Sequence, residues 1–156
     1  MDTLEHPVIV ALRDAGTLQP RDLAFLIRNG RSYTGAELPP GTETWPAGKC
    51  ILASETLAQR HGWQFRTGFG LLPRSVVGDS RRLPLRHAWT TPDRERAFDA
   101  VWPDSEHAEY FGLGPEYEGW LDHAVDQQAA ARKRGIPADL VPGSFAQSLR
   151  RQFGFG

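Results

Sequence analysis

The sequence contains a single cysteine, Cys50, and it has no apolar run long enough to cross a membrane. One cysteine cannot form an intramolecular disulfide, and a membrane helix requires about 20 consecutive apolar residues. The apolar run "PVIVAL" near the N-terminus is too short for a secretory core and has no basic leader before it. We therefore expect a cytoplasmic protein that is held together by its hydrophobic core and is not associated with a membrane.

A large excess of one charge is also lacking, because 18 basic and 19 acidic residues give a formal net charge of -1 at pH 7. A balanced chain has no overall field that would attract nucleic acid, so we expect no nucleic-acid partner. One cysteine and scattered histidines lack the spacing of a zinc site, and no glycine-rich loop has the context that phosphate binding requires. The sequence thus predicts neither a metal nor a cofactor.

The length of 156 residues suits one domain, 1–156, with helices at both ends of a central core. Two helices are expected within 7–30, because "PVIVALRDAG" and "PRDLAFLIRNG" each end in glycine and the second begins with proline. Residues 31–48 are rich in Gly, Pro and Thr, which indicates an irregular connection with one short strand at its start. Two further helices are expected within 115–152.

The core, about 48–112, opens with the best helical pattern of the first half of the chain. In "KCILASETLAQRHG", Cys50, Ala53 and Leu57 recur at helical spacing and Gly62 provides a stop. Three strand candidates follow, "WQFRTGFGLL", "LPLRHAWTT" and "RERAFDAVW", with the turn "TPDRE" between the last two. This order predicts an α+β fold in which the Cys50 helix packs on a small antiparallel sheet.

The last two strand candidates bring a histidine and an aspartate together. If they pair about a turn centred on Asp93, His87 lies six residues before the centre and Asp99 lies six residues after it. Directly opposed residues of an antiparallel pair have Cβ atoms about 4.5–5.5 Å apart on one face, within reach of a hydrogen bond between imidazole and carboxylate. A slip of one residue in one strand would place them on opposite faces.

Cys50 adds a nucleophile to this pair. A thiol in the first turn of a helix feels the positive end of the helix dipole and unpaired N–H groups, which favour the thiolate. If the Cys50 end of the helix packs on the face that carries His87, the imidazole can pair with the thiolate while Asp99 orients the ring.

The motifs "HAW" and "FDAVW", after a cysteine that begins a helix, resemble the transglutaminase-like branch of the papain-like cysteine fold. The segment "EYFGL" is similar to the "YFG" of small bacterial and phage proteins of this type, so the resemblance covers roughly 48–112. It implies a papain-like core with Cys50 as nucleophile, His87 as general base and Asp99 as orienting residue.

The sequence departs from the pattern of this family at two places. Asn-Ala is missing after the cysteine, and "TWPAGKC" has no glutamine before it to help form an oxyanion hole. The backbone N–H of Cys50 is one candidate donor, and Tyr33 or Trp45 offers a second. The aromatic residues considered for the lining of a substrate cleft, each of which can equally be core, are Tyr33, Trp45, Trp89, Trp102 and Tyr110. The arginines considered for binding a substrate carboxylate, each of which can equally be solvated, are Arg74, Arg81, Arg82 and Arg86.

Each member of the triad also has a structural alternative. A lone cysteine is most often buried packing, and a strand histidine can be half-buried and bonded to backbone. Asp99 is harder to explain in this way, because aspartate is depleted in strands and is rarely buried without a partner.

Together these features predict cysteine-dependent acyl transfer, by hydrolysis or aminolysis of an amide, ester or thioester through a thioester acyl-enzyme. The expected partner is a peptide or small-molecule acyl substrate, with an amine acceptor or a carrier-bound acyl group as further options. The alternative is a non-catalytic interaction or accessory module that keeps the fold with an inert thiol.

Overall fold

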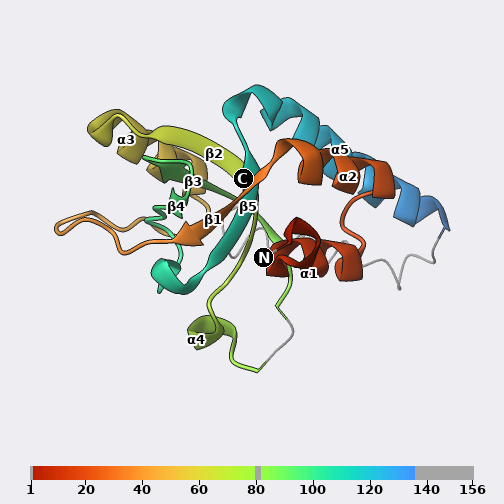
Figure 1. Ribbon diagram of the computed structural model, residues 1–156, viewed down its shortest axis with the longest axis horizontal. Coiled ribbons are helices and arrows are strands. Elements are labelled where there is room, and N and C mark those ends of the chain that lie inside the picture. The colour runs from red at the N-terminus through yellow and green to blue at the C-terminus, as the bar shows by residue number, and fades with distance from the viewer. Residues whose placement is uncertain (1, 80–81, 136–156) are drawn as a thin grey trace.

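The computed structural model describes residues 2–79 and 82–135, and the chain is an α+β protein with a small, curled, mixed sheet. Helices α1, α2 and α5 gather on one side of the sheet, while α3 lies on the other (Figure 1). The helices are α1 Pro7–Ala15, α2 Pro20–Asn29, α3 Cys50–His61, α4 Arg74–Val77 and α5 Glu118–Gly135. The strands are β1 Arg31–Gly35, β2 Gln64–Leu71, β3 Leu85–Thr91, β4 Arg96–Ala97 and β5 Glu109–Leu113.

The order of the strands in the sheet is β3-β2-β5-β1-β4. Neighbouring strands are antiparallel except β1 and β4, which are parallel, so the expectation of an antiparallel sheet was wrong for this edge. One antiparallel bridge joins Thr90 of β3 to Phe98, just after β4, through backbone hydrogen bonds of 3.1 and 2.8 Å. Because β3 and β4 stand at opposite ends of the strand order, this bridge curls the sheet back on itself.

The segment "RERAFDAVW" differs from the strand that its sequence predicts. Only Arg96–Ala97 is a strand, and Asp99 lies beyond it. The bridge between Thr90 and Phe98 centres the turn on Arg94 instead of Asp93, a displacement of the register by two residues. A displacement by an even number keeps each side chain on its predicted face, so His87 and Asp99 remain on the same side.

The physical reason for the longer turn lies in Asp93 and Arg94. The carboxylate of Asp93 accepts hydrogen bonds from the backbone N–H of Glu95 at 3.0 Å and of Arg96 at 2.9 Å. Arg94 has a positive φ of 64°, a conformation uncommon for a non-glycine residue. The chain is thereby held in a wide turn, and the strand that follows takes β1 as its partner.

Residues on the two faces of the sheet belong to two separate cores. On β5, Phe111 faces the helices while the adjacent Tyr110 faces the interior of the curl, as the period of two in a strand requires. The buried residues packed between helices and sheet are Val8, Ile9, Leu12, Leu18, Leu26, Phe69, Leu71, Phe111, Leu113, Leu121, Ala124 and Val125. The buried residues of the interior cluster are Tyr33, Leu72, Leu85, Trp89, Ala97, Trp102, Ala108 and Tyr110.

Glycines on β2 and β5 provide the space that the indoles of the interior cluster fill. A Cβ on Gly70 would stand 2.7 Å from the ring of Trp102, and a Cβ on Gly112 would stand 2.6 Å from the ring of Trp89. Such distances are shorter than van der Waals contact, so the packing of both tryptophans depends on glycine at these positions.

The helices expected at both ends agree with the structure where it describes them. The two helices expected within 7–30 are confirmed as α1 and α2. Helix α5 accounts for the first helix expected within 115–152, whereas the second lies outside the described residues. At the C-terminal end of α1, Gln128 of α5 donates a hydrogen bond to the carbonyl of the C-cap residue Gly16 at 3.2 Å, and Arg132 donates to the carbonyl of Ala15 at 2.7 Å.

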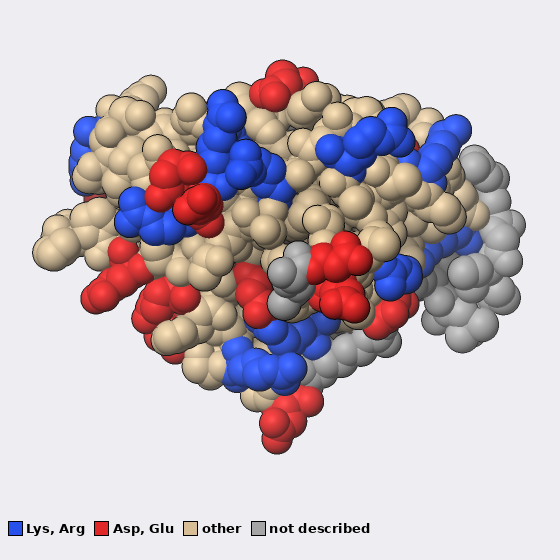
Figure 2. All heavy atoms as spheres, viewed as in Figure 1, with Lys and Arg blue, Asp and Glu red and all other residues tan. Residues whose placement is uncertain are grey.

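The described residues also bear on membrane association and on surface charge. Within 2–79 and 82–135, no helix is both long enough and apolar enough to span a bilayer. On the face shown in Figure 2, acidic and basic side chains are interspersed, as expected for a chain with almost no net charge.

Candidate active site

Cys50 is the first residue of α3 and is 4% exposed. Ala53, Ser54 and Leu57 are buried on the same helix, so the predicted apolar face holds α3 on the protein, where it packs mainly on β3. The N-cap residue, Lys49, makes no side-chain capping bond. The N–H groups of the first turn have no acceptor within the helix, and the region around the sulfur is therefore rich in hydrogen-bond donors.

His87 on β3 and Asp99 after β4 form a buried pair. The distance between His87 Nε2 and Asp99 Oδ2 is 2.8 Å, and the two side chains are 0% and 1% exposed. A carboxylate in such a site costs free energy unless it is paired and hydrogen-bonded. Asp99 meets both conditions, as the sequence led us to expect of an aspartate in this segment.

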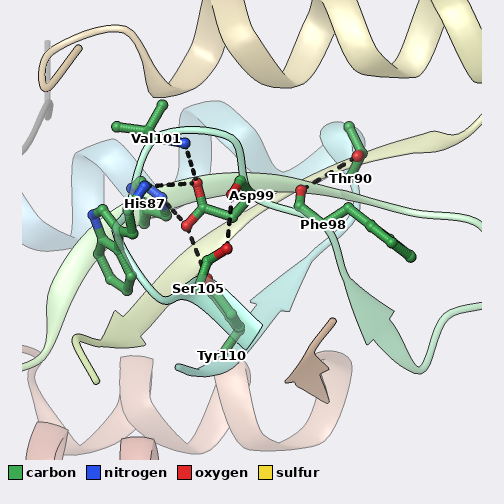
Figure 3. Close-up of polar contacts among 8 residues, drawn as sticks. His87, Thr90, Phe98, Asp99, Val101, Ser105 and Tyr110 are labelled. Carbon is green, nitrogen blue, oxygen red and sulfur yellow. Dashed lines mark hydrogen bonds and ion pairs between the residues drawn. The ribbon is translucent and has the colours of Figure 1, made fainter. Parts of the chain in front are cut away.

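The Asp99 carboxylate accepts hydrogen bonds on both oxygens, as Figure 3 shows. Oδ2 accepts from His87 and also from the hydroxyl of Tyr110 at 2.8 Å. Oδ1 accepts from the backbone N–H of Val101 at 2.9 Å and of Trp102 at 3.3 Å. The hydroxyl of Ser105 donates to the Asp99 carbonyl at 2.9 Å and fixes the backbone of this loop.

The electrostatics of His87 place Cys50 within reach of its ring. Burial lowers the pKa of His87, but the charge of Asp99 and its hydrogen bond raise it, as do a hydrogen bond and a charge interaction with Cys50, to about 9. Because Asp99 occupies Nε2, the other ring nitrogen, Nδ1, is the one that remains for the sulfur. The structure therefore brings together the three predicted residues in the order sulfur, imidazole, carboxylate.

Trp102 covers the imidazole. Its indole stacks on the His87 ring with centroids 3.9 Å apart and an interplanar angle of 16°. It is almost fully buried, which removes water from one face of the ring. Trp102 thus packs directly against the site, whereas its predicted contact with a substrate stays a prediction.

The other aromatic residues predicted to bind substrate lie at different depths. Tyr33 and Trp89 are buried in the interior cluster in edge-to-face contact, and the Tyr33 hydroxyl accepts a hydrogen bond from Arg66 at 3.0 Å. Trp45 is partly exposed, and its backbone N–H donates to the carbonyl of Ala100 at 2.9 Å. Trp45 therefore connects the loop before the cysteine to the residue that follows Asp99.

The arginines considered for a substrate carboxylate have structural partners where the structure describes them. Arg82 bonds Glu109 at 3.2 Å and the Leu72 carbonyl at 3.0 Å, and Arg86 bonds Asp122 of α5. Arg74 is exposed on α4, and Arg81 lies outside the described residues.

Tyr110 was predicted only as one of several aromatics near a cleft, and its contact with Asp99 was missed. The five-residue run "EYFGL" was not predicted as a strand, although it is β5 and lies in the centre of the sheet. The available signal was two adjacent aromatic residues in a short apolar run between turns, which is typical of a buried strand.

Comparison with known proteins gives no match, since no family model fits the chain and no curated protein or solved structure is significantly similar to it. Among the described residues, no three His, Cys, Asp or Glu side chains are placed to hold a metal ion. The function is therefore inferred from the geometry of Cys50, His87 and Asp99.

Proposed function

We propose that this protein is a cysteine-dependent acyl-transfer enzyme with a papain-like, transglutaminase-like arrangement of its active site. The observation that supports this proposal is a buried imidazole between the Cys50 side chain and the Asp99 carboxylate. A cysteine kept only for packing would not need a histidine that is itself held by a carboxylate. A nucleophile, a base and a group that orients the base are the parts that covalent catalysis requires.

In the first step, the Cys50 sulfur attacks the carbonyl carbon of an amide, ester or thioester. The new C–S bond gives a tetrahedral oxyanion, which collapses to a thioester as the bond to the leaving group breaks. The proton that His87 took from the thiol passes to the leaving group, so charge and atoms balance. A His87 pKa of about 9 keeps the ring protonated at neutral pH and ready to donate this proton.

In the second step, His87 takes a proton from water or an amine, which attacks the thioester carbon. The C–S bond breaks, the acid or amide leaves, and the proton returns the Cys50–His87 pair to its starting state. Water makes the protein a hydrolase, whereas an amine makes it a transferase of the transglutaminase type. Both outcomes share the first step and the same acyl-enzyme.

The oxyanion would be stabilised by the start of α3. The first-turn N–H groups belong to Cys50 and the residues directly after it, and they lack an acceptor within the helix. Preorganised donors of this kind contribute about 3–4 kcal/mol each to an acyl-transfer transition state. Because no glutamine precedes Cys50 to supply a side-chain donor, an oxyanion hole formed by backbone N–H groups is the simplest arrangement.

The test is to trap the acyl-enzyme. The protein is mixed with activated acyl esters and acyl thioesters, quenched in acid and analysed by intact-mass and peptide mass spectrometry. We expect one acyl group per chain on Cys50, no adduct in Cys50→Ser, and a strongly reduced rate in His87→Gln. His61→Gln, which changes an exposed histidine at the other end of α3, is the matched control and should react like the wild type.

Acylation at other residues, or equal adduct in Cys50→Ser, would contradict the proposal and favour the non-catalytic module. Hydrolysis and aminolysis are then distinguished by following the decay of the adduct with and without a primary amine.

A further inference from the structure

Tyr110 makes a contact that the proposed chemistry does not yet explain. Its hydroxyl donates to Asp99 Oδ2, the same oxygen that bonds His87 Nε2, and each of the two distances is 2.8 Å. The three side chains come from different parts of the fold, Tyr110 from the central strand β5, His87 from β3 and Asp99 from the loop after β4. Figure 3 shows Tyr110 and His87 on either side of the carboxylate.

Asp99 lies outside the ladder of the sheet, one residue after the bridge between Thr90 and Phe98, so the direction of its carboxylate is set by hydrogen bonds to the side chain. The N–H groups of Val101 and Trp102 fix the carboxylate relative to its own loop. Among the described hydrogen bonds of the carboxylate, only those from His87 and Tyr110 come from the sheet. The bridge between Thr90 and Phe98 fixes the neighbouring main chain, and Tyr110 is the side chain other than His87 through which the sheet holds the carboxylate itself.

We propose that Tyr110 is a positioning residue of the active site, which holds Asp99 in place for His87 and limits the strength with which the carboxylate binds the imidazole proton. This role deepens the acyl-transfer function proposed above and rests on it. In this scheme the Tyr110 hydroxyl acts through Asp99 and not on a reacting atom, and Tyr110→Phe keeps the ring, which stacks near the imidazole with centroids 6.3 Å apart.

Because Tyr110 and His87 bond the same oxygen of Asp99, a change at Tyr110 should alter how strongly the carboxylate attracts the imidazole proton. A phenol O–H that donates to Oδ2 stabilises the negative charge on that oxygen, so less of it is available to attract the proton on Nε2. The charged and titratable groups that face this centre are Cys50 from α3, Asp99, and Glu106, whose charge reaches Tyr110. Burial, the charge and hydrogen bond of Asp99, and Glu106 raise the pKa of Tyr110, so the phenol stays a donor over the working pH range.

Tyr33 offers a matched control within the same core. It lies directly opposite Tyr110 in the β1–β5 pair, and both side chains are buried in the interior cluster. The hydroxyl of Tyr33, however, bonds Arg66 instead of Asp99. Tyr33→Phe and Tyr110→Phe thus remove the same atom from neighbouring places, and only the second removal touches the carboxylate.

The experiment is an NMR titration of His87 in protein with isotopically labelled histidine. We expect Tyr110→Phe to raise the pKa of His87 by about half a unit or more, a shift that corresponds to about a threefold change in proton affinity. Tyr33→Phe should leave the titration unchanged. An unchanged or lowered pKa in Tyr110→Phe, or the same rise in both variants, would overturn the proposal.

A second perturbation acts in the opposite direction and keeps the full side chain. Replacement of tyrosine by 3-fluorotyrosine makes the phenol a stronger donor, so the pKa of His87 should fall, both in the wild type and in the Tyr33→Phe background. A pKa that does not fall would overturn the proposal even if Tyr110→Phe did not fold. Neither titration needs a substrate, so an acyl-enzyme with an unmoved titration refutes the role of Tyr110 and leaves the proposed function standing.

Discussion

The buried His87–Asp99 pair should make the protein less stable at alkaline pH than at neutral pH. The pKa of His87 rises from an ordinary value of 6.5 to about 9 in the folded protein. A group whose pKa is raised on folding stabilises the native state below its unfolded pKa and loses that contribution as the pH rises through the folded value. A shift of this size corresponds to about 3 kcal/mol, which should be present at pH 6 and almost absent at pH 10.

The assay is urea unfolding of Cys50→Ser and of the double variant Cys50→Ser, His87→Gln at intervals between these two pH values. The serine removes the thiol whose ionisation is coupled to His87, and the difference in unfolding free energy between the two proteins removes the effect of groups that titrate independently of His87. We expect this difference to fall by about 3 kcal/mol, with most of the loss between pH 7 and 9.5. A difference that stays constant over this range, or that grows with pH, would show that His87 is not a cation in the folded protein.

Two further predictions test the surroundings of the pair. Asp99→Asn keeps the shape of the side chain but removes its charge, so burial should dominate and lower the pKa of His87 by more than about one unit. NMR titration of His87 measures this shift, and an unmoved pKa would mean that the carboxylate does not set the charge of the ring. Gly70→Ala places a Cβ against the Trp102 ring and should destabilise the protein by about 1–3 kcal/mol in urea unfolding and slow the reaction of Cys50. The matched control Gly119→Ala adds its Cβ in open space in the first turn of α5 and should be neutral or slightly stabilising; equal losses in the two variants would refute the packing role of Gly70.

The helices of this protein could be predicted from the sequence because their signals are local. The prolines that open α1 and α2, and Gly62 after α3, act within a turn of the positions that they define. The start of α3 at Cys50, on which the nucleophile depends, was predicted on the same basis. Alternation also gave β2 and β3, including the common face of Leu85, His87 and Trp89.

The strands β4 and β5 could not be predicted with the same success, because their partners are far away in the sequence. β4 pairs with β1, about 60 residues earlier, and β5 lies between β1 and β2. No local pattern records these neighbours, so a purely antiparallel sheet was expected. The register of the hairpin was missed by two residues because Asp93 and Arg94 widen the turn.

The predicted proximity of His87 and Asp99 is correct despite the error in register, for a geometric reason. Side chains alternate along a strand, so an error of two residues leaves His87 and Asp99 on one face, whereas an error of one would separate them. The contacts of Asp99 with Tyr110, Val101 and Trp102 depend on how β5 and the loop close over the pair. These contacts become visible only in three dimensions.

The most direct measurement of the central claim is the rate of alkylation of Cys50 by iodoacetamide at pH 6.5, which is specific because the chain has one cysteine. An ordinary free thiol, with a pKa of about 8.5, is only about 1% ionised at this pH, whereas a protonated imidazole beside the sulfur favours the thiolate. We predict that the wild type reacts at least about tenfold faster than His87→Gln. Equal rates in the two proteins, or a wild-type thiol that reacts only after unfolding, would contradict the account.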